Sequence, residues 1–300
     1  MSNLLRLSAC LFLCVSLNSF GGTIFGLYQN SNIVRGYDTD TGQLTHEFGN
    51  AVFDKDSPLF VYDDVIYGYR NHSNKIYGYD VNSGQKVVEQ GLQSSPDRES
   101  WYLSPELKIY GWSNNSNTVS IMDLSSGLVE NTLTSVSYKN NSAIVLSPNN
   151  ILYGAASSNR ILGYDVENGN LTAIIENANP EAEVLTYNNG LILGSSDNNN
   201  DVLGYDANGG WGSTQTTDIT KANQHGMWTS GENHIYVYDG NSHTMYKQEI
   251  GTTDYNPFNF HAVLTSGTSI AYQPSPVPLP AGIYLFLSGL VGLFGVKLRG

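Results

Sequence analysis

Apolar residues in this chain fall into short runs, and one of these runs returns at a nearly fixed interval. Its best copy is residues 161–169, where Ile-Leu-Gly-Tyr-Asp is followed by Val-Glu-Asn-Gly. The Asp of successive copies occupies positions 38, 80, 123, 165 and 206, so the copies are 42, 43, 42 and 41 residues apart. A sixth copy, whose residues have diverged from the motif, ends at Glu249, 43 residues after Asp206. A period of this length predicts a repeat built from small sheets.

The residue types of the motif predict its local structure. Val, Ile, Leu and Tyr before the Asp suit a pleated strand. The Asp carboxylate can accept hydrogen bonds from the backbone N–H groups that follow it and so close a tight turn. The Gly four residues later supplies the positive φ of a hairpin corner. Each copy therefore predicts a strand, a turn and a second strand, such as Leu171 to Ile175.

Two further apolar runs precede the motif in each unit. In the fourth unit they are Ala143 to Leu146 and Ile151 to Gly154. Each unit is thus four short antiparallel strands, and its strands are apolar on both faces. Packing such sheets radially, as the blades of a propeller, covers both faces. The sequence predicts an all-β, six-bladed β-propeller of four-stranded antiparallel blades over residues 22–272.

The two ends of this region predict how the ring closes. Thr23 to Gly26 resembles the second strand of a blade, and no first strand precedes it. We expect Ala262 to Thr265 to supply that missing strand. Ser269 to Tyr272 then resembles a surplus strand, which leaves a seven-bladed ring open as the alternative.

Segments outside the repeats resemble export signals. Residues 1–21 carry one charge, Arg6, before the apolar segment Leu7 to Leu17, which predicts a signal peptide. Residues 273–280 are a Pro-rich linker. Residues 281–296 are uncharged and apolar, and a basic tail completes the segment 281–300. As a helix this apolar run would be about 24 Å long, which predicts one transmembrane helix with a cytoplasmic C-terminus.

Charge and cysteine content exclude several classes of protein. The net charge is −13, and three of the fourteen Lys and Arg residues lie in the predicted flanking segments. The repeat region therefore carries eleven cations against 27 acidic residues. Such a surface repels nucleic acid and anionic lipid. Both cysteines, Cys10 and Cys14, lie in the predicted signal peptide, so the mature protein has no disulfide.

Motifs of known enzymes are missing from the sequence. It has no Gly-x-Ser-x-Gly elbow, no P-loop and no cysteine nucleophile, and its six His residues show no metal-ligand spacing. We therefore predict no catalytic residue and no metal site. Asp197 and Asp201 flank three Asn residues and are weak candidates for a cation, with a solvated loop as the alternative.

One ligand-binding surface is suggested by the loops. The loop between the second and third strands is rich in Asn and Ser in every unit, and it shares a face with the connections between blades. Those connections supply our candidate ligand-binding residues: Arg98, Trp101, Tyr138, His225, Trp228 and Phe260. Amides and exposed rings together are typical of neutral sugar sites. The alternative is that Asn and Ser make turns and that the aromatic residues pack between blades.

The C-terminal segment resembles a known sorting signal. Val277-Pro278-Leu279-Pro280-Ala281, a short apolar helix and Lys-x-Arg together resemble the VPLPA variant of the PEP-CTERM signal. That family implies a Gram-negative bacterium, export by the Sec translocon and transient anchoring in the inner membrane. An exosortase would then cleave near the motif and pass the protein to the cell surface or an exopolysaccharide matrix.

The repeats resemble those of YVTN-type and quinoprotein-like β-propellers. In quinoprotein repeats a docking Trp lies eight residues after the Asp. The corresponding residues here are His46, Val88, Asn131, Ala173 and Thr214. Because none is Trp, we expect no cofactor.

Together these features predict an exported, monomeric and non-enzymatic protein of the cell surface or extracellular matrix. It would bind or support other matrix components, with exopolysaccharide glycans and surface proteins as candidate partners. The alternative is a propeller enzyme, a lyase or hydrolase, with its site in the central funnel, because this fold hosts many activities.

Overall fold

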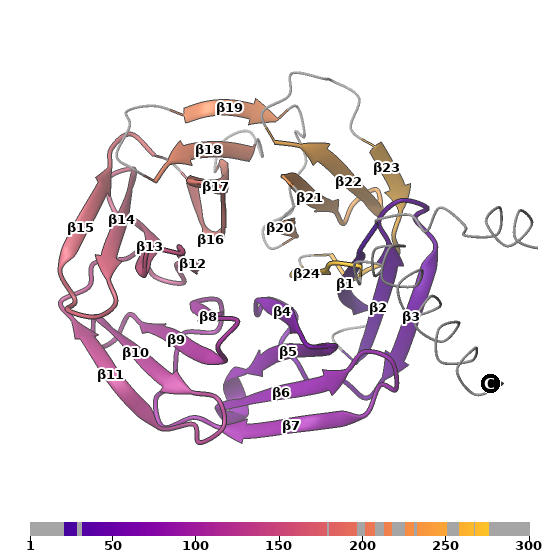
Figure 1. The fold of residues 1–300 in the computed structure, drawn as a ribbon, viewed down its shortest axis with the longest axis horizontal. Coiled ribbons are helices and arrows are strands. Elements are labelled where there is room, and N and C mark those ends of the chain that lie inside the picture. The colour runs from indigo at the N-terminus through magenta and orange to yellow at the C-terminus, as the bar shows by residue number, and fades with distance from the viewer. Residues whose placement is uncertain are drawn as a thin grey trace, which may run out of the picture. The chain divides into compact units, whose positions relative to one another are not determined.

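The computed structural model describes residues 21–28, 32–178, 180–196, 202–207, 213–217, 226–230, 233–250, 258–266 and 268–275. These residues form twenty-four strands in six four-stranded sheets (Figure 1). All strand pairs are antiparallel, and the sheets surround a common axis, so the fold is the predicted six-bladed β-propeller. The compact unit is Gly22–Gln273. The predicted sorting segment, and the predicted signal peptide up to residue 20, lie outside the described residues.

Each blade runs from an inner strand at the axis to an outer strand at the rim. The first blade contains β24 (Ile270–Gln273), β1 (Thr23–Tyr28), β2 (Ile33–Asp38) and β3 (Leu44–Gly49). The second contains β4 (Leu59–Tyr62), β5 (Val65–Arg70), β6 (Lys75–Asp80) and β7 (Lys86–Gly91), with the 3₁₀ helix η1 (Asn71–Ser73) between β5 and β6. The third contains β8 (Trp101–Leu103), β9 (Lys108–Ser113), β10 (Thr118–Asp123) and β11 (Val129–Thr134).

The remaining three blades repeat this arrangement. The fourth contains β12 (Ile144–Leu146), β13 (Ile151–Ala156), β14 (Arg160–Asp165) and β15 (Leu171–Ile175). The fifth contains β16 (Pro180–Asn188), β17 (Leu191–Ser196), β18 (Val202–Asp206) and β19 (Ser213–Thr217). The sixth contains β20 (Met227–Thr229), β21 (His234–Asp239), β22 (Thr244–Glu249) and β23 (Phe258–His261).

The ring closes through a C-terminal strand, as predicted, but through a different one. Strand β24 pairs with β1, with Ile270 opposite Gly26. Our assignment of Ala262 to Thr265 was wrong, because these residues form the connection between β23 and β24. A methyl group on Gly26 would lie 2.6 Å from Leu264 Cδ1, so the Leu264 side chain occupies the space beside that glycine. Ser269 to Tyr272 is therefore the closing strand, and the ring has six blades.

Glycines in the second strands make room for the connections between blades. A methyl group on Gly68 would lie 2.4 Å from Phe53, and one on Gly154 would lie 2.6 Å from Tyr138. Phe53 and Tyr138 belong to the connections that enter the second and fourth blades. These two connections are thus each anchored by one large side chain that lies over a glycine of the blade it enters.

The repeated Asp-x-x-x-Gly segment forms the predicted turn. Asp80 Oδ1 accepts hydrogen bonds from the Ser83 N–H and from the Ser83 hydroxyl, both at 2.7 Å. Gly84 closes the turn at φ +67°. The Tyr79 hydroxyl donates to the Asn50 carbonyl at 3.1 Å, which ties this hairpin to the connection that enters its blade. Equivalent turns follow Asp38, Asp123 and Asp165.

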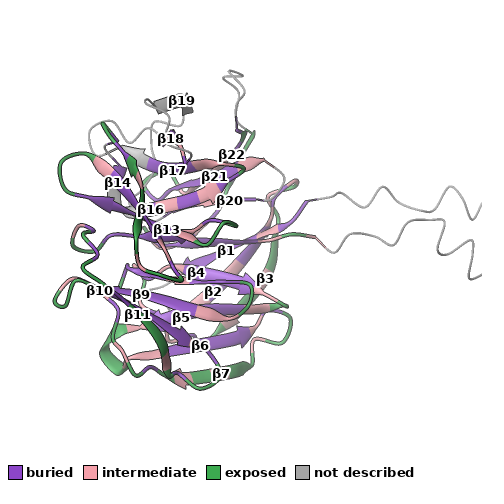
Figure 2. Ribbon diagram, turned by 60° about the vertical axis from the view of Figure 1, so that its left-hand side comes forward, coloured by how far each residue is buried: buried purple, intermediate pink, exposed green. Residues whose placement is uncertain are grey.

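The hydrophobic core consists of six clusters, each between two neighbouring blades. Phe25 and Leu59, for example, belong to the cluster between the first and second blades, and Ile144 and Trp112 to that between the third and fourth. The outer strands contribute little, because β7 has exposed and half-buried residues in alternation (Figure 2). Packing between blades therefore holds the fold together.

Candidate functional site

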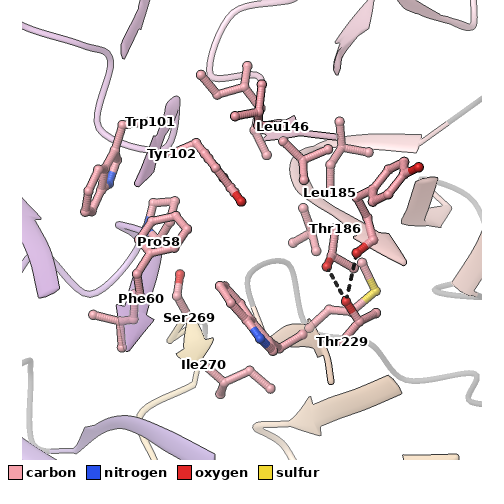
Figure 3. A pocket seen from close by; sticks show the side chains of 18 residues that line it. Pro58, Phe60, Trp101, Tyr102, Leu146, Leu185, Thr186, Thr229, Ser269 and Ile270 are labelled. Carbon is pink, nitrogen blue, oxygen red and sulfur yellow. Dashed lines mark hydrogen bonds between the residues drawn. The ribbon is translucent and has the colours of Figure 1, made fainter. Parts of the chain in front are cut away.

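A small cavity lies on the axis of the propeller (Figure 3). Its eighteen lining residues come from all six inner strands or from the residues just before them. The cavity volume is about 150 Å³. Sites for small-molecule ligands have volumes of roughly 300–1,000 Å³. The axial cavity is therefore smaller than an ordinary ligand site.

Aromatic side chains restrict the axial cavity. The ring centroid of Phe60 lies 5.4 Å from that of Tyr102 and 5.5 Å from that of Trp228, both in edge-on geometry. Phe60 belongs to the second blade and Trp228 to the sixth, so their contact bridges the inner end of the first blade. These rings fill much of the space that an open channel would need.

Hydroxyl groups provide most of the polar atoms in this cavity. The Thr186 and Thr229 hydroxyls lie 2.7 Å apart and share a hydrogen bond (Figure 3). Burial raises the pKa of Tyr102 to about 12. Burial also raises the pKa of Tyr62, whose hydroxyl donates to the Leu103 carbonyl at 2.8 Å. Both phenols therefore keep their protons at neutral pH.

A second hollow lies on the face formed by the loops, and we name it the loop-face cleft. It has a volume of about 310 Å³. Its lining residues come from the first two blades and the connections that follow them: Asn32, Val52, Phe53, Asp54, Lys55, Asp56, Arg70 and Arg98. Loops after second and fourth strands emerge on the same side, because the chain direction alternates within an antiparallel blade. The cleft thus lies on the face where we expected a ligand.

Hydrogen bonds and ion pairs fix several side chains of the cleft. Arg98 Nη2 lies 3.0 Å from Asp56 Oδ2 and 2.8 Å from Glu99 Oε1. Burial alone would lower the pKa of Arg98, but the hydrogen bond to Glu99 and the charge of Asp56 outweigh it, so the pKa is raised. Asp54 Oδ2 accepts a hydrogen bond from the Asn71 N–H at 2.7 Å. These groups are therefore preorganised.

Two other cations of the cleft are available to a ligand. Lys55 Nζ lies 3.7 Å from Asp56 Oδ1, and 53% of the Lys55 side chain is exposed. Among the residues that the structure describes, Arg70 makes no ion pair, and its side chain is half-buried at the end of β5. The cleft thus contains two cations that pair with Asp56, of which Lys55 is exposed, and one, Arg70, that pairs with no carboxylate of the described residues.

The structure does not bring the candidate ligand-binding residues together. Arg98 lines the loop-face cleft, whereas Trp101 and Trp228 line the axial cavity. Tyr138 lies over Gly154, and its hydroxyl donates to the Leu152 carbonyl at 2.6 Å. His225, together with the cation candidates Asp197 and Asp201, lies outside the described residues.

Three of the candidate aromatic residues are buried. Trp101, Tyr138 and Phe260 are 1%, 6% and 8% exposed. Trp101 Nε1 donates to Ser57 Oγ at 2.8 Å. Phe260 forms part of the outer strand β23 and not, as we expected, a connection between blades. The alternative interpretation, in which aromatic residues pack between blades, describes these side chains.

Sequence reasoning missed most of the loop-face cleft. Of its charged residues only Arg98 was a candidate, and Lys55, Asp56 and Arg70 were not. Its lining residues span positions 32 to 98, so no linear motif marks them. The one available signal was that cations are scarce in the sequence. The repeat region has eleven Lys and Arg residues, and three of them line this cleft.

Comparisons with known proteins give one structural likeness. No protein-family model matches the sequence, and no curated protein matches it. One similar solved structure is the crystal structure of BamB from Moraxella catarrhalis, with 16% sequence identity and a TM-score of 0.43. The match covers 84% of this chain and 81% of that one. The six four-stranded sheets themselves show that the chain is a β-propeller repeat protein.

Two further observations concern the described part of the chain. No helix there is long and apolar enough to cross a membrane. Nor do three His, Cys, Asp or Glu side chains gather there in a way that could hold a metal ion. The predicted transmembrane helix lies outside these residues.

Proposed function

We propose that the protein is an exported, non-enzymatic binding protein of the cell surface or extracellular matrix. The loop-face cleft is the single observation that carries this proposal. Its volume, about 310 Å³, reaches the range of ligand sites, and its charged groups are fixed by hydrogen bonds. The axial cavity has half that volume and is restricted by three aromatic rings.

The sequence supports the export part of the proposal. A signal peptide over residues 1–21 takes the chain to the Sec translocon, and the segment 281–300 anchors it in the inner membrane. An exosortase then cleaves near Val277 to Ala281 and releases the propeller, as a monomer, to the surface. No cofactor or metal is needed for this role.

Mass spectrometry tests both processing steps together. We expect the cell-associated and released forms to lack residues 1–21 and 281–300. A mature protein that keeps residues 281–300 and stays in the inner membrane would show that the C-terminal segment is an ordinary anchor.

The alternative function is catalysis at the axis, by a lyase or a hydrolase. It rests on Tyr62 and Tyr102, the two phenols that meet beside the axial cavity. Incubating the full-length protein with extracellular polysaccharide and measuring new reducing or unsaturated ends tests it. Product formation that the substitution Tyr102→Phe abolishes would establish the enzyme and overturn the binding protein.

A further inference from the structure

We infer that the loop-face cleft binds a saccharide that carries a carboxylate, such as a uronic acid unit of a polysaccharide. This inference rests on the proposed function and names the class of its ligand. Arg70 and Lys55 bind the carboxylate, and the acidic and amide side chains beside them bind hydroxyl groups.

The concentration of cations is the first argument. The repeat region is strongly acidic, yet three of its eleven Lys and Arg residues line one cleft. Cations elsewhere are mostly neutralised in ion pairs: Arg35 with Glu47, Lys75 and Lys86 with Glu89, Lys108 with Glu130, and Lys247 with Asp40. Arg70 differs from these, because it pairs with no carboxylate of the described residues.

The geometry of the cations favours a carboxylate. A guanidinium presents its N–H donors as a planar fork that matches the two oxygens of a carboxylate. Arg98 cannot supply this fork, since Asp56 and Glu99 already hold it at 3.0 Å and 2.8 Å. Arg70 can supply such a fork, and the exposed amine of Lys55 adds a second positive charge in the same cleft.

The remaining lining residues favour a sugar over an acidic peptide. Asp54 uses Oδ2 for the Asn71 N–H, and its carboxylate has further acceptor capacity for a hydroxyl group. The Asn32 amide can both donate to a hydroxyl and accept from one. The half-buried Val52 gives the cleft an apolar part, against which the C–H face of a sugar ring can pack.

The overall charge sets a limit on the ligand. A peptide with many adjacent carboxylates would meet Asp54 and Asp56 in the cleft and an acidic surface around it. A uronic acid unit carries one carboxylate and several hydroxyl groups. It therefore satisfies the two accessible cations without placing further negative charge beside the two aspartates.

Calorimetric titration of the full-length protein with monomeric galacturonic acid, which carries a single carboxylate, tests the inference. We expect saturable binding of the acid and none of its methyl ester, which has the same ring and no charge. The substitution Arg70→Gln should weaken binding by about ten- to a hundredfold, as expected for a charge-assisted hydrogen-bonded pair. Arg70→Lys keeps the charge but loses the fork and should give an intermediate affinity.

Arg160→Gln is the matched control. Arg160 begins β14 in the corresponding loop of the fourth blade, where its Nε donates to the Ser157 carbonyl at 3.3 Å. Its substitution removes the same charge from the same face but leaves the cleft intact. We expect unchanged binding, and unchanged melting of all three variants confirms that they fold.

Several results would overturn the inference. Equal binding of the acid and the ester would show that the carboxylate is not recognised, and wild-type affinity of Arg70→Gln would show that the cleft is not the site. Tight, Arg70-dependent binding of polyglutamate instead of galacturonic acid would assign the cleft to an acidic peptide. Binding of neither would reject the ligand class, whereas surface delivery, measured separately by mass spectrometry, would stand.

Discussion

At the scale of single residues, the Gly that ends the turn after Asp80 meets two independent demands. Gly84 has φ +67°, a conformation that side chains disfavour. A methyl group on Gly84 would also lie 2.5 Å from Cβ of Phe48, which belongs to the outer strand of the preceding blade. The turn therefore closes a hairpin and also packs closely against its neighbour.

Replacing Gly84 by Ala should destabilise the protein. Backbone strain at positive φ alone costs about 1–3 kcal/mol, and the contact with Phe48 adds to it. Gly91→Ala is the matched control, because Gly91 ends the next strand of the same blade and a methyl group there would have no neighbour within 4 Å. Urea unfolding of both variants measures the difference, and equal stabilities would contradict this account of the turn.

Glu89 predicts a specific dependence of stability on pH. Hydrogen bonds from Lys75 and Lys86 lower the pKa of Glu89 from 4.5 to about 2. A carboxylate with a lowered pKa in the folded state stabilises that state above its unfolded pKa, and this contribution is lost as the pH falls through the folded value. Glu89→Gln should therefore reduce stability at pH 7, by an amount that disappears towards pH 2.

Unfolding of both proteins by urea at several pH values tests this expectation. Glu176→Gln serves as the control, because Glu176 makes no ion pair among the described residues. A difference between wild type and Glu89→Gln that stays constant from pH 7 to pH 2 would contradict the assigned pKa shift.

At the scale of elements, the closing strand β24 is short, yet we expect it to contribute strongly to the stability of the fold. Ile270 is 1% exposed, pairs with Gly26 and belongs to the core between the sixth and first blades. We expect Ile270→Ala to cost about 2–5 kcal/mol, the range for truncating a buried aliphatic side chain. Val87→Ala, on the outer strand β7 where Val87 is 54% exposed, should stay within about 0.5 kcal/mol of wild type.

Thermal and urea unfolding measure both variants. A small effect of Ile270→Ala would show that the β24–β1 pairing contributes little to the fold.

The elements that could be predicted from the sequence are those that recur at intervals of 41 to 43 residues. The third strands, their Asp turns and the number of blades follow from periodicity, because residue types recur where backbone conformation recurs. The closing strand was assigned wrongly because Ala262 to Thr265 and Ser269 to Tyr272 are both short apolar runs. Only the space beside Gly26, filled by Leu264, distinguishes them, and that packing is a tertiary property.

The site was less predictable than the fold for the same physical reason. Tyr138 was expected on a ligand surface, but it packs over Gly154. The recurring glycine in second strands was the available signal for this burial. The loop-face cleft depends on Arg70 of the second blade and Arg98 of the next connection, and the charged residues at these positions do not recur with the period.

At the scale of the whole molecule, stability and binding belong to different parts of the propeller. The six core clusters lie between blades and repeat around the ring. Among the described residues, the loops between second and third strands contribute none to these clusters, so their residues can vary without breaking the core. This separation allows one regular ring to carry a charged cleft over its first two blades and the connections that follow them.

Ring closure should also make unfolding cooperative. In an open array of repeats the terminal units have one neighbour each and unfold first. Here β24 joins the ends, so every blade has two neighbours. We expect one urea transition, at which tryptophan fluorescence and far-ultraviolet circular dichroism change together. Among the described residues, Trp101 and Trp112 in the third blade and Trp228 in the sixth contribute to the fluorescence. Ending the chain before Ile270 should open the ring, lower the urea concentration at the midpoint of unfolding and separate the fluorescence transition from the circular dichroism transition. Separate transitions in the full-length protein would contradict a closed ring in which every blade supports its neighbours.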